Sequence, residues 1–164
     1  MNPILSILIP SVPSRFLKLN SLLRHFEAPD SVEILALVDN KCRTVGAKRQ
    51  ALLETARGDY VAFCDDDDWT TTDYIEELLP RCESGPDVVT FEQDAAINGA
   101  HGRIVFDAAC RIDEPWKADG TARRRPWHVC AWRRSLALEG VFKFCNYGED
   151  AAWVDQVAPL DRKS

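Results

Sequence analysis

Four consecutive aspartates are the residues of this chain whose types and spacing point most directly to chemistry. Asp65 to Asp68 follow the apolar run 60–64, which is typical of a short buried β-strand. Two carboxylates about 4 Å apart repel by roughly 4 kcal/mol at an effective dielectric of 20, so a fold that gathers several requires a cation or a protonated carboxyl. Hard oxygen ligands favour Mg²⁺ or Mn²⁺, which commonly bind substrate phosphates as well. The alternative is a solvated acidic turn that caps the next helix, for which one carboxylate is enough.

Acidic residues at two other places complete the set of candidate groups. Asp39 follows the expected strand 33–38, and Glu149 and Asp150 stand where the last helix is expected to begin. Because the carboxyl ends of parallel strands meet at one sheet edge, we expect Asp39 and Asp65 to lie there and to bind a base, a ribose or a metal. Alternatively, Asp39 can be a turn residue that accepts hydrogen bonds from its own backbone, and Glu149 and Asp150 can be acids that the dipole of the last helix favours at its N-terminus.

Apolar runs alternate with helical periodicity along the first half of the chain. The expected strands are 4–9, 33–38, 60–64, 87–91, 104–106 and 129–132, and the expected helices are 15–28, 44–57, 73–79 and 150–157. The alternation favours an α/β fold with a mostly parallel sheet and crossover helices.

Local signals define where several of these elements begin and end. We expect Pro10 to end the first strand, Gly58 to cap helix 44–57, Thr70-x-x-Asp73 to form a capping box, Asn98-Gly99 to form a hairpin turn, and 104–106 to be an edge strand.

Bulk properties are those of an ordinary soluble protein. The chain has 164 residues, 46% of them hydrophobic and 28% charged, with a net charge of −6 that does not favour nucleic acid or anionic membrane over the whole surface. No apolar run reaches the ~20 residues that span a bilayer, so no membrane insertion is expected. The start has no basic signal-peptide region and the six cysteines contain no C-x-x-C pair, so we expect a reduced, cytoplasmic protein.

One segment departs from the acidic balance. Residues 123–134 contain no acidic residue and hold Arg123, Arg124, Arg125, Trp127, His128, Trp132, Arg133 and Arg134. Basic residues interleaved with aromatics fit a phosphate-bearing or polymeric acceptor, DNA included. An arginine-rich loop over a diphosphate, or simple solubility, would explain the same composition.

The chain resembles the family 2 glycosyltransferases of the GT-A fold. The matching segments occur in the family order and are 6–11, 38–40, 46–50, 58–68 and 148–153. The resemblance covers about residues 4–157. It implies one GT-A-like domain, 1–164, with a Rossmann-like nucleotide-binding half at about 1–92 and an acceptor and catalytic half with a small mixed sheet at about 93–164.

The same resemblance implies roles for particular residues. The donor-site residues would be Pro10, Ser11, Asp39, Lys48, Arg49, Asp65 and Asp66. Asp65 and Asp67 would form a D-x-D motif on Mn²⁺ or Mg²⁺, with His128 as a further ligand. Asp150 would be the general base and Glu149 would orient it. Each has a structural alternative: Lys48 and Arg49 can form a solvated helix face, and a lone histidine is often structural.

The implied reaction is a metal-dependent, inverting transfer of a sugar from a nucleoside diphosphate sugar, with UDP favoured, to an acceptor hydroxyl. The acceptor would be a saccharide or, as in compact phage-type enzymes, a hydroxymethylated DNA base flipped out of the duplex. Only fourteen residues follow Asp150, so we expect an acceptor site that is minimal, open or completed by another chain.

Other classes fit the sequence less well. A haloacid-dehalogenase-type phosphatase would have Thr or Val at the position of Trp69, and an EF-hand loop starting at Asp65 would have glycine at Thr70. A nucleotidyltransferase would have a glycine-rich loop at 11–15. A glycosyltransferase-like module that binds a nucleotide without catalysis remains an alternative.

Overall fold

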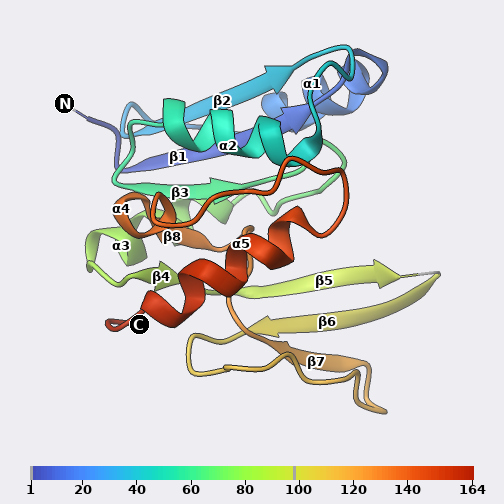
Figure 1. Cartoon of the computed structure of the whole chain (residues 1–164), viewed down its shortest axis with the longest axis vertical. Helices are drawn as coiled ribbons and strands as arrows, with labels where there is room; N and C mark the ends of the chain where they lie inside the picture. The colour runs from blue at the N-terminus through green and yellow to red at the C-terminus, as the bar shows by residue number, and fades with distance from the viewer. Residues whose placement is uncertain (1, 98) are drawn as a thin grey trace.

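A five-stranded sheet forms the centre of the protein in this computed structural model, which describes residues 2–97 and 99–164 (Figure 1). The strands, in sheet order, are β2 (Val32–Val38), β1 (Leu5–Ser11), β3 (Tyr60–Phe63), β8 (Ala131–Arg133) and β4 (Val88–Val89). The β1 strand pairs in parallel with β2 and β3, and β8 runs antiparallel to both β3 and β4. The predicted α/β class with a mostly parallel sheet is confirmed.

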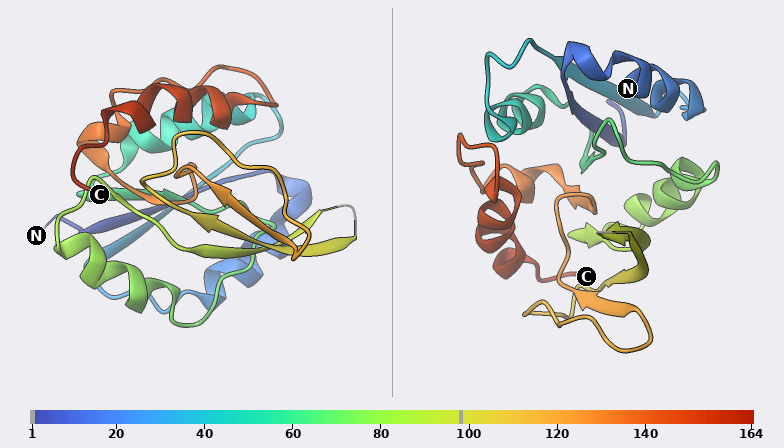
Figure 2. Two further views of the ribbon diagram at one scale, coloured as in Figure 1. Left: turned by 90° about the horizontal axis from the view of Figure 1, so that it is seen from below. Right: turned by 90° about the vertical axis from the view of Figure 1, so that its right-hand side faces the viewer.

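Helices cover both faces of this sheet. They are α1 (Phe16–His25), α2 (Val45–Thr55), α3 (Tyr74–Glu83), α4 (Arg134–Ala137) and α5 (Glu149–Val157), with short 3-10 helices at Pro13–Arg15 and Ala158–Leu160. The α1 and α3 helices lie on one face, and α2 and α5 lie on the other (Figure 2). This is the arrangement that crossover connections between parallel strands produce.

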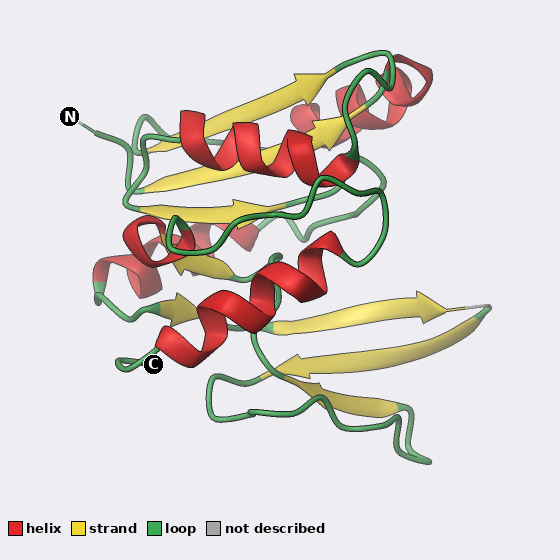
Figure 3. Cartoon of the chain, viewed as in Figure 1, coloured by secondary structure: helices red, strands yellow, loops and turns green. Residues whose placement is uncertain are grey.

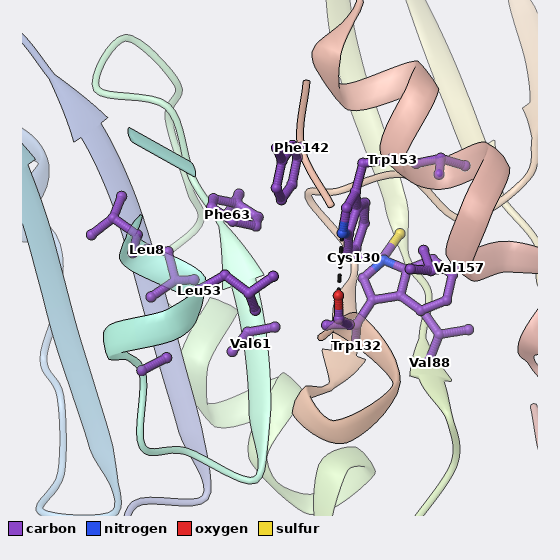
Figure 4. Close-up of a cluster of buried hydrophobic side chains, with 14 of the residues drawn as sticks. Leu8, Leu53, Val61, Phe63, Val88, Cys130, Trp132, Phe142, Trp153 and Val157 are labelled. Carbon is purple, nitrogen blue, oxygen red and sulfur yellow. Dashed lines mark hydrogen bonds between the residues drawn. The ribbon is translucent and has the colours of Figure 1, made fainter. Parts of the chain in front are cut away.

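Side chains alternate along the strands and so divide the core into two clusters. Leu8, Val61 and Phe63 face α2 and α5, whereas their neighbours Ile7 and Ala62 face α1 and α3. The first cluster contains the bulkiest groups (Figure 4). In it the ring of Trp153 stacks on that of Phe142 at 4.9 Å, and Trp153 Nε1 donates to the carbonyl of Ala137 at 3.2 Å. These contacts fix α5, and therefore its first residues, against the sheet.

A second, three-stranded sheet lies beside the first (Figure 3). It contains β5 (Glu92–Ile97), β6 (Ala100–Phe106) and β7 (Thr121–Arg124), with β5 antiparallel and β7 parallel to the central β6. The expected small mixed sheet is therefore present. Residues 104–106 lie in its middle strand, so the expectation of an edge strand was wrong. Asn98, half of the expected hairpin turn, lies outside the described residues.

Two predicted caps are absent. The α2 helix ends at Thr55 with Ala56 as its C-cap, and Gly58 lies instead where a Cβ would come within 2.5 Å of Ser6 Oγ. Asp73 precedes α3 without a side-chain capping bond. The β1 strand also continues through Pro10 to Ser11, because proline is tolerated near a strand end.

The two predicted halves are interleaved in space. The second sheet begins at Glu92, close to the expected boundary, but β8 returns between β3 and β4 and α5 packs on the first sheet. This return places the residues just before β8 beside the end of β3, where the aspartates lie.

Candidate active site

Chain direction brings the candidate groups to one edge of the main sheet. Ser11 ends β1, Asp39 follows β2, and Asp65 follows β3. Because β8 is antiparallel, His128 lies at the same edge, and its carbonyl accepts the N–H of Phe63 at 3.2 Å. The order along the edge is therefore Asp39, Ser11, Asp65 and His128, and the carboxyl ends of strands are where open α/β sheets bind ligands.

Lys48 joins the ends of the first two strands. Its side chain is buried, its Nζ donates to the carbonyl of Ser11 at 2.7 Å, and Nζ lies 3.4 Å from Asp39 Oδ1. Asp39 also accepts the backbone N–H groups of Lys41 and Arg43, both at 3.1 Å. Lys48 is thus buried at this sheet edge and does not belong to a solvated helix face, and Asp39 closes its own turn.

Arg49 links the aspartate cluster to the last helix. Its Nη2 donates to both carboxylate oxygens of Asp65 at 2.9 and 3.1 Å, and its Nε donates to Glu149 Oε1 at 3.3 Å. The guanidinium lies over the ring of Phe63, 5.3 Å from the centroid, and the residue is only 3% exposed. The single Nη2 is thus shared between both oxygens of Asp65 while Nε binds Glu149, so one guanidinium holds the two carboxylates together.

Arg15 contacts the next two aspartates, Asp66 and Asp67, through its guanidinium. Its Nη1 donates to Asp66 Oδ1 at 2.8 Å and lies 3.2 Å from Asp67 Oδ2, and Ser11 Oγ donates to Asp66 Oδ2 at 2.5 Å. Asp66 is therefore buried and fully engaged, whereas Asp67 is exposed to the crevice. Arg15 was not among the predicted site residues, although its basic side chain follows the turn after β1.

Asp68 is the aspartate with an unusual protonation equilibrium. It is largely buried, and burial, with the neighbouring charge of Asp65, raises its pKa from 3.8 to about 6. Its Oδ2 accepts the N–H of Asp65 at 3.1 Å. Asp68 therefore closes the turn on which the other aspartates stand.

The two acidic residues at the start of α5 have different partners. Glu149 is buried against Arg49, whereas Asp150 is partly open and its Oδ2 lies 3.6 Å from His128 Nδ1. Burial first, and then the charge of Arg49, holds the pKa of His128 well below its usual 6.5. The imidazole is accordingly neutral near pH 7, and its contact with Asp150 is not an ion pair.

The predicted three-ligand metal site is not formed by these side chains. Among residues 2–97 and 99–164, no three His, Cys, Asp or Glu residues are grouped so that they could hold a metal ion. Asp65 is paired with Arg49, and His128 faces Asp150. Mg²⁺ and Mn²⁺ commonly need only one or two carboxylates when substrate phosphates complete the shell, so exposed Asp67 with Asp65 still fits a metal shared with a diphosphate.

The arginine-rich segment is not the open surface that the sequence suggested. Arg123 pairs with Asp107 at 2.6 Å, Arg125 with Asp155 at 2.6 Å, and Arg133 with Asp87 at 3.2 Å. Trp132 is completely buried in the core. Acidic residues distant in the sequence supply the partners, which is why the composition of 123–134 alone was misleading.

Comparisons with known proteins agree with this geometry. The model of the family described as Glycosyl transferase family 2 matches residues 19–138. The chain belongs to this family. It is also 36% identical over 136 residues to EpsH of Bacillus subtilis (strain 168), which is named as a glycosyltransferase; the match covers 74% of this chain and 39% of EpsH.

Solved structures share the GT-A fold of this family 2 member. S. aureus TarS 1-349 in complex with UDP-GlcNAc superposes with a TM-score of 0.68 at 15% identity, over 97% of this chain and 54% of that one. The complex of the same TarS fragment with UDP gives a TM-score of 0.61 at 16% identity, over 92% of this chain and 55% of that one. The chain thus spans well under two thirds of these relatives.

Every helix among the described residues is too short or too polar to cross a bilayer.

Proposed function

We propose that the chain transfers a sugar from a UDP-sugar to a hydroxyl of a saccharide, with inversion at the anomeric carbon and with the aid of Mn²⁺ or Mg²⁺. The observation that supports this most strongly is the edge arrangement: Asp39 and Asp65 follow the ends of β2 and β3 at one sheet edge, and Asp150 lies 3.6 Å from His128 at the same edge. The UDP-GlcNAc complex of TarS, which has the same fold, supports a UDP-sugar donor.

The donor would lie along this edge in a fixed direction. Asp39 and Ser11 border the base and ribose, with Lys48 holding both strand ends. The diphosphate would then reach Asp65 and Asp67. A divalent cation bound there would neutralise the charge that develops on the leaving diphosphate.

Asp150 would act as the general base. Its carboxylate takes the proton of the acceptor hydroxyl while the hydroxyl oxygen forms a bond to the anomeric carbon. The bond from that carbon to the β-phosphate oxygen breaks, and its electron pair leaves with UDP. Glu149, held by Arg49, fixes the start of α5 and hence the position of Asp150. General-base help of this kind is typically worth about 10²–10⁴ in rate.

A DNA acceptor is the weaker alternative. It relied on free arginines and exposed aromatics in 123–134, and the structure pairs Arg123, Arg125 and Arg133 with acids. A phosphate backbone would have to displace these partners.

Replacing the base tests the proposal. Asp150→Asn should reduce UDP release from UDP-GlcNAc, measured with Mn²⁺ and simple saccharide acceptors, by about 10²–10⁴, while calorimetric affinity for UDP changes little. The control is Asp155→Asn, an exposed residue of the same helix. An Asp150→Asn enzyme that turns over at the wild-type rate would contradict the assignment.

A further inference from the structure

A pocket on the far side of Asp65 from Asp39 belongs to neither the base nor the diphosphate region. It has a volume of about 440 Å³, within the range of about 300–1,000 Å³ typical of small-ligand sites. Its lining residues come from the aspartate turn, the segment before β8 and the second sheet. A larger groove of about 690 Å³ shares Asp68, Gln93 and Val129 with it, so the pocket is open to a longer ligand.

The pocket has aromatic walls and a polar rim. Trp116 and Trp127 line it together with Phe106, and Asp65 and His128 border it on the side of the reaction. The C–H face of a pyranose packs on aromatic rings while its hydroxyls require hydrogen-bond partners at the edges. The chemistry of the pocket therefore matches a sugar ring.

Two polar atoms of the lining residues lack partners. Trp127 Nε1 and His128 Nδ1 are buried and make no hydrogen bond in this structure. Buried polar groups are almost always paired in proteins, so such atoms beside a pocket indicate a ligand that supplies hydroxyl oxygens. His128 also connects this pocket with Asp150, because its Nδ1 lies 3.6 Å from Asp150 Oδ2.

The arginines of β7 hold the wall that contains Trp116. Residues 107–120 connect β6 to β7, and Arg123 binds Asp107 while Arg124 Nη1 donates to the carbonyl of Glu114 at 2.8 Å. Trp116 lies over Gly102, where a Cβ would come within 2.5 Å of the indole. Arg123 and Arg124 thus hold the 107–120 connection, and Gly102 leaves room for the Trp116 ring that it carries.

We infer that this pocket, with Trp116 and Trp127 as its walls, binds the pyranose ring of the saccharide acceptor and presents one hydroxyl to Asp150. The inference rests on the proposed sugar transfer. It adds the place where the acceptor binds and the residues that hold it.

Indole N–H resonances give a direct test. The chain has five tryptophans, so the ¹⁵N-labelled full chain should show five such signals, assigned with Trp→Phe variants. The probes are methyl β-glucopyranoside, methyl β-galactopyranoside and methyl N-acetyl-β-glucosaminide, each titrated with and without UDP and Mn²⁺. At least one should shift the Trp116 and Trp127 signals saturably. Trp153, which is buried in the core and bonded to Ala137, should not move.

Variants separate a binding role from a folding role. Trp116→Ala should weaken the sugar about tenfold, and Trp116→Phe should retain most of the affinity. If Trp116→Ala does not fold, Gly102→Ala is the second variant. Its added methyl group displaces the Trp116 indole and should also weaken sugar binding. An unchanged Trp153 signal confirms the fold in each case.

A single-stranded oligonucleotide that contains hydroxymethylcytosine is titrated in parallel. Three outcomes would overturn the inference: no shift with any of the three sugars, equal shifts of all five signals, or shifts with the oligonucleotide alone. A failed donor site is a separate result, since UDP affinity is measured by calorimetry and does not depend on Trp116.

Discussion

At the scale of residues, the site is a set of carboxylates held by two arginines, of which Arg49 is buried and Arg15 is partly exposed. Arg49 binds Asp65 and Glu149, Arg15 binds Asp66 and approaches Asp67. These pairs explain how four adjacent aspartates can coexist before any metal or nucleotide arrives. Removing one cation would leave buried negative charge uncompensated, a change that typically costs about 3–5 kcal/mol.

Asp68 provides a test of this electrostatic description. Its pKa is about 6 in the folded chain and 3.8 when unperturbed, so the folded state keeps a proton between these values that the unfolded state has lost. Stability should therefore decrease as the pH rises from about 4 to above 6. Asp68→Asn, whose amide oxygen can still accept the N–H of Asp65, should remove up to about 3 kcal/mol of this dependence.

Urea unfolding at several pH values, with a chelator present, measures the effect. The control is Asp73→Asn, an exposed aspartate that makes no capping bond. If the Asp68→Asn and wild-type stabilities differ by the same amount at pH 4.5 and pH 7, the raised pKa is wrong.

At the scale of elements, two helices meet where the motif around Gly46 begins α2. A Cβ on Gly46 would come within 1.8 Å of the carbonyl oxygen of Lys143, and the Gly46 N–H donates to the carbonyl of Cys145 at 3.1 Å. The segment 143–148 leads directly into Glu149. The glycine therefore sets how closely the segment that leads into α5 approaches α2.

Gly46→Ala should lower stability by about 1–3 kcal/mol, because the added methyl group has no room and the 143–148 segment must shift. It should also reduce sugar transfer more than the stability loss accounts for at 25 °C. Denaturant unfolding and UDP release measure the two effects, with the exposed Glu54→Ala on the same helix as the control. A wild-type unfolding midpoint for Gly46→Ala would contradict the packing described here.

Elements with strong local signals were predictable, and those defined by distant contacts were not. The apolar runs at β1, β2 and β3 and the periodicity of α1 located the nucleotide half within a few residues. The β5 and β7 strands were missed, since their sequences are polar and pair only with β6.

The same distinction applies to the site. Strand direction was enough to bring Asp39 and Asp65 to one edge. The pairing of Arg49 with Glu149, 100 residues away, and the burial of Trp132 are consequences of tertiary packing that spacing cannot reveal. The open basic surface expected at 123–134 is absent for the same reason, since the acidic partners of its arginines lie outside the segment.

At the scale of the whole molecule, residues at one edge of the five-stranded sheet and residues of the small mixed sheet line one pocket. The chain spans 39% of EpsH and 54% of the TarS fragment, yet the donor edge, the candidate base and the proposed sugar pocket all lie within it. The proposed donor site and the proposed acceptor pocket thus lie on opposite sides of Asp65.

Calorimetric titration with UDP, with Mn²⁺ and then with EDTA, tests the central claim most directly, and Asp67→Asn and Asp73→Asn serve as the site variant and its control. We predict saturable 1:1 binding that weakens at least about tenfold without Mn²⁺ and in Asp67→Asn, but not in Asp73→Asn. Undetectable binding of UDP with Mn²⁺, or an affinity that stays at the wild-type Mn²⁺ value in EDTA or in Asp67→Asn, would contradict a metal-dependent donor site at the aspartate cluster.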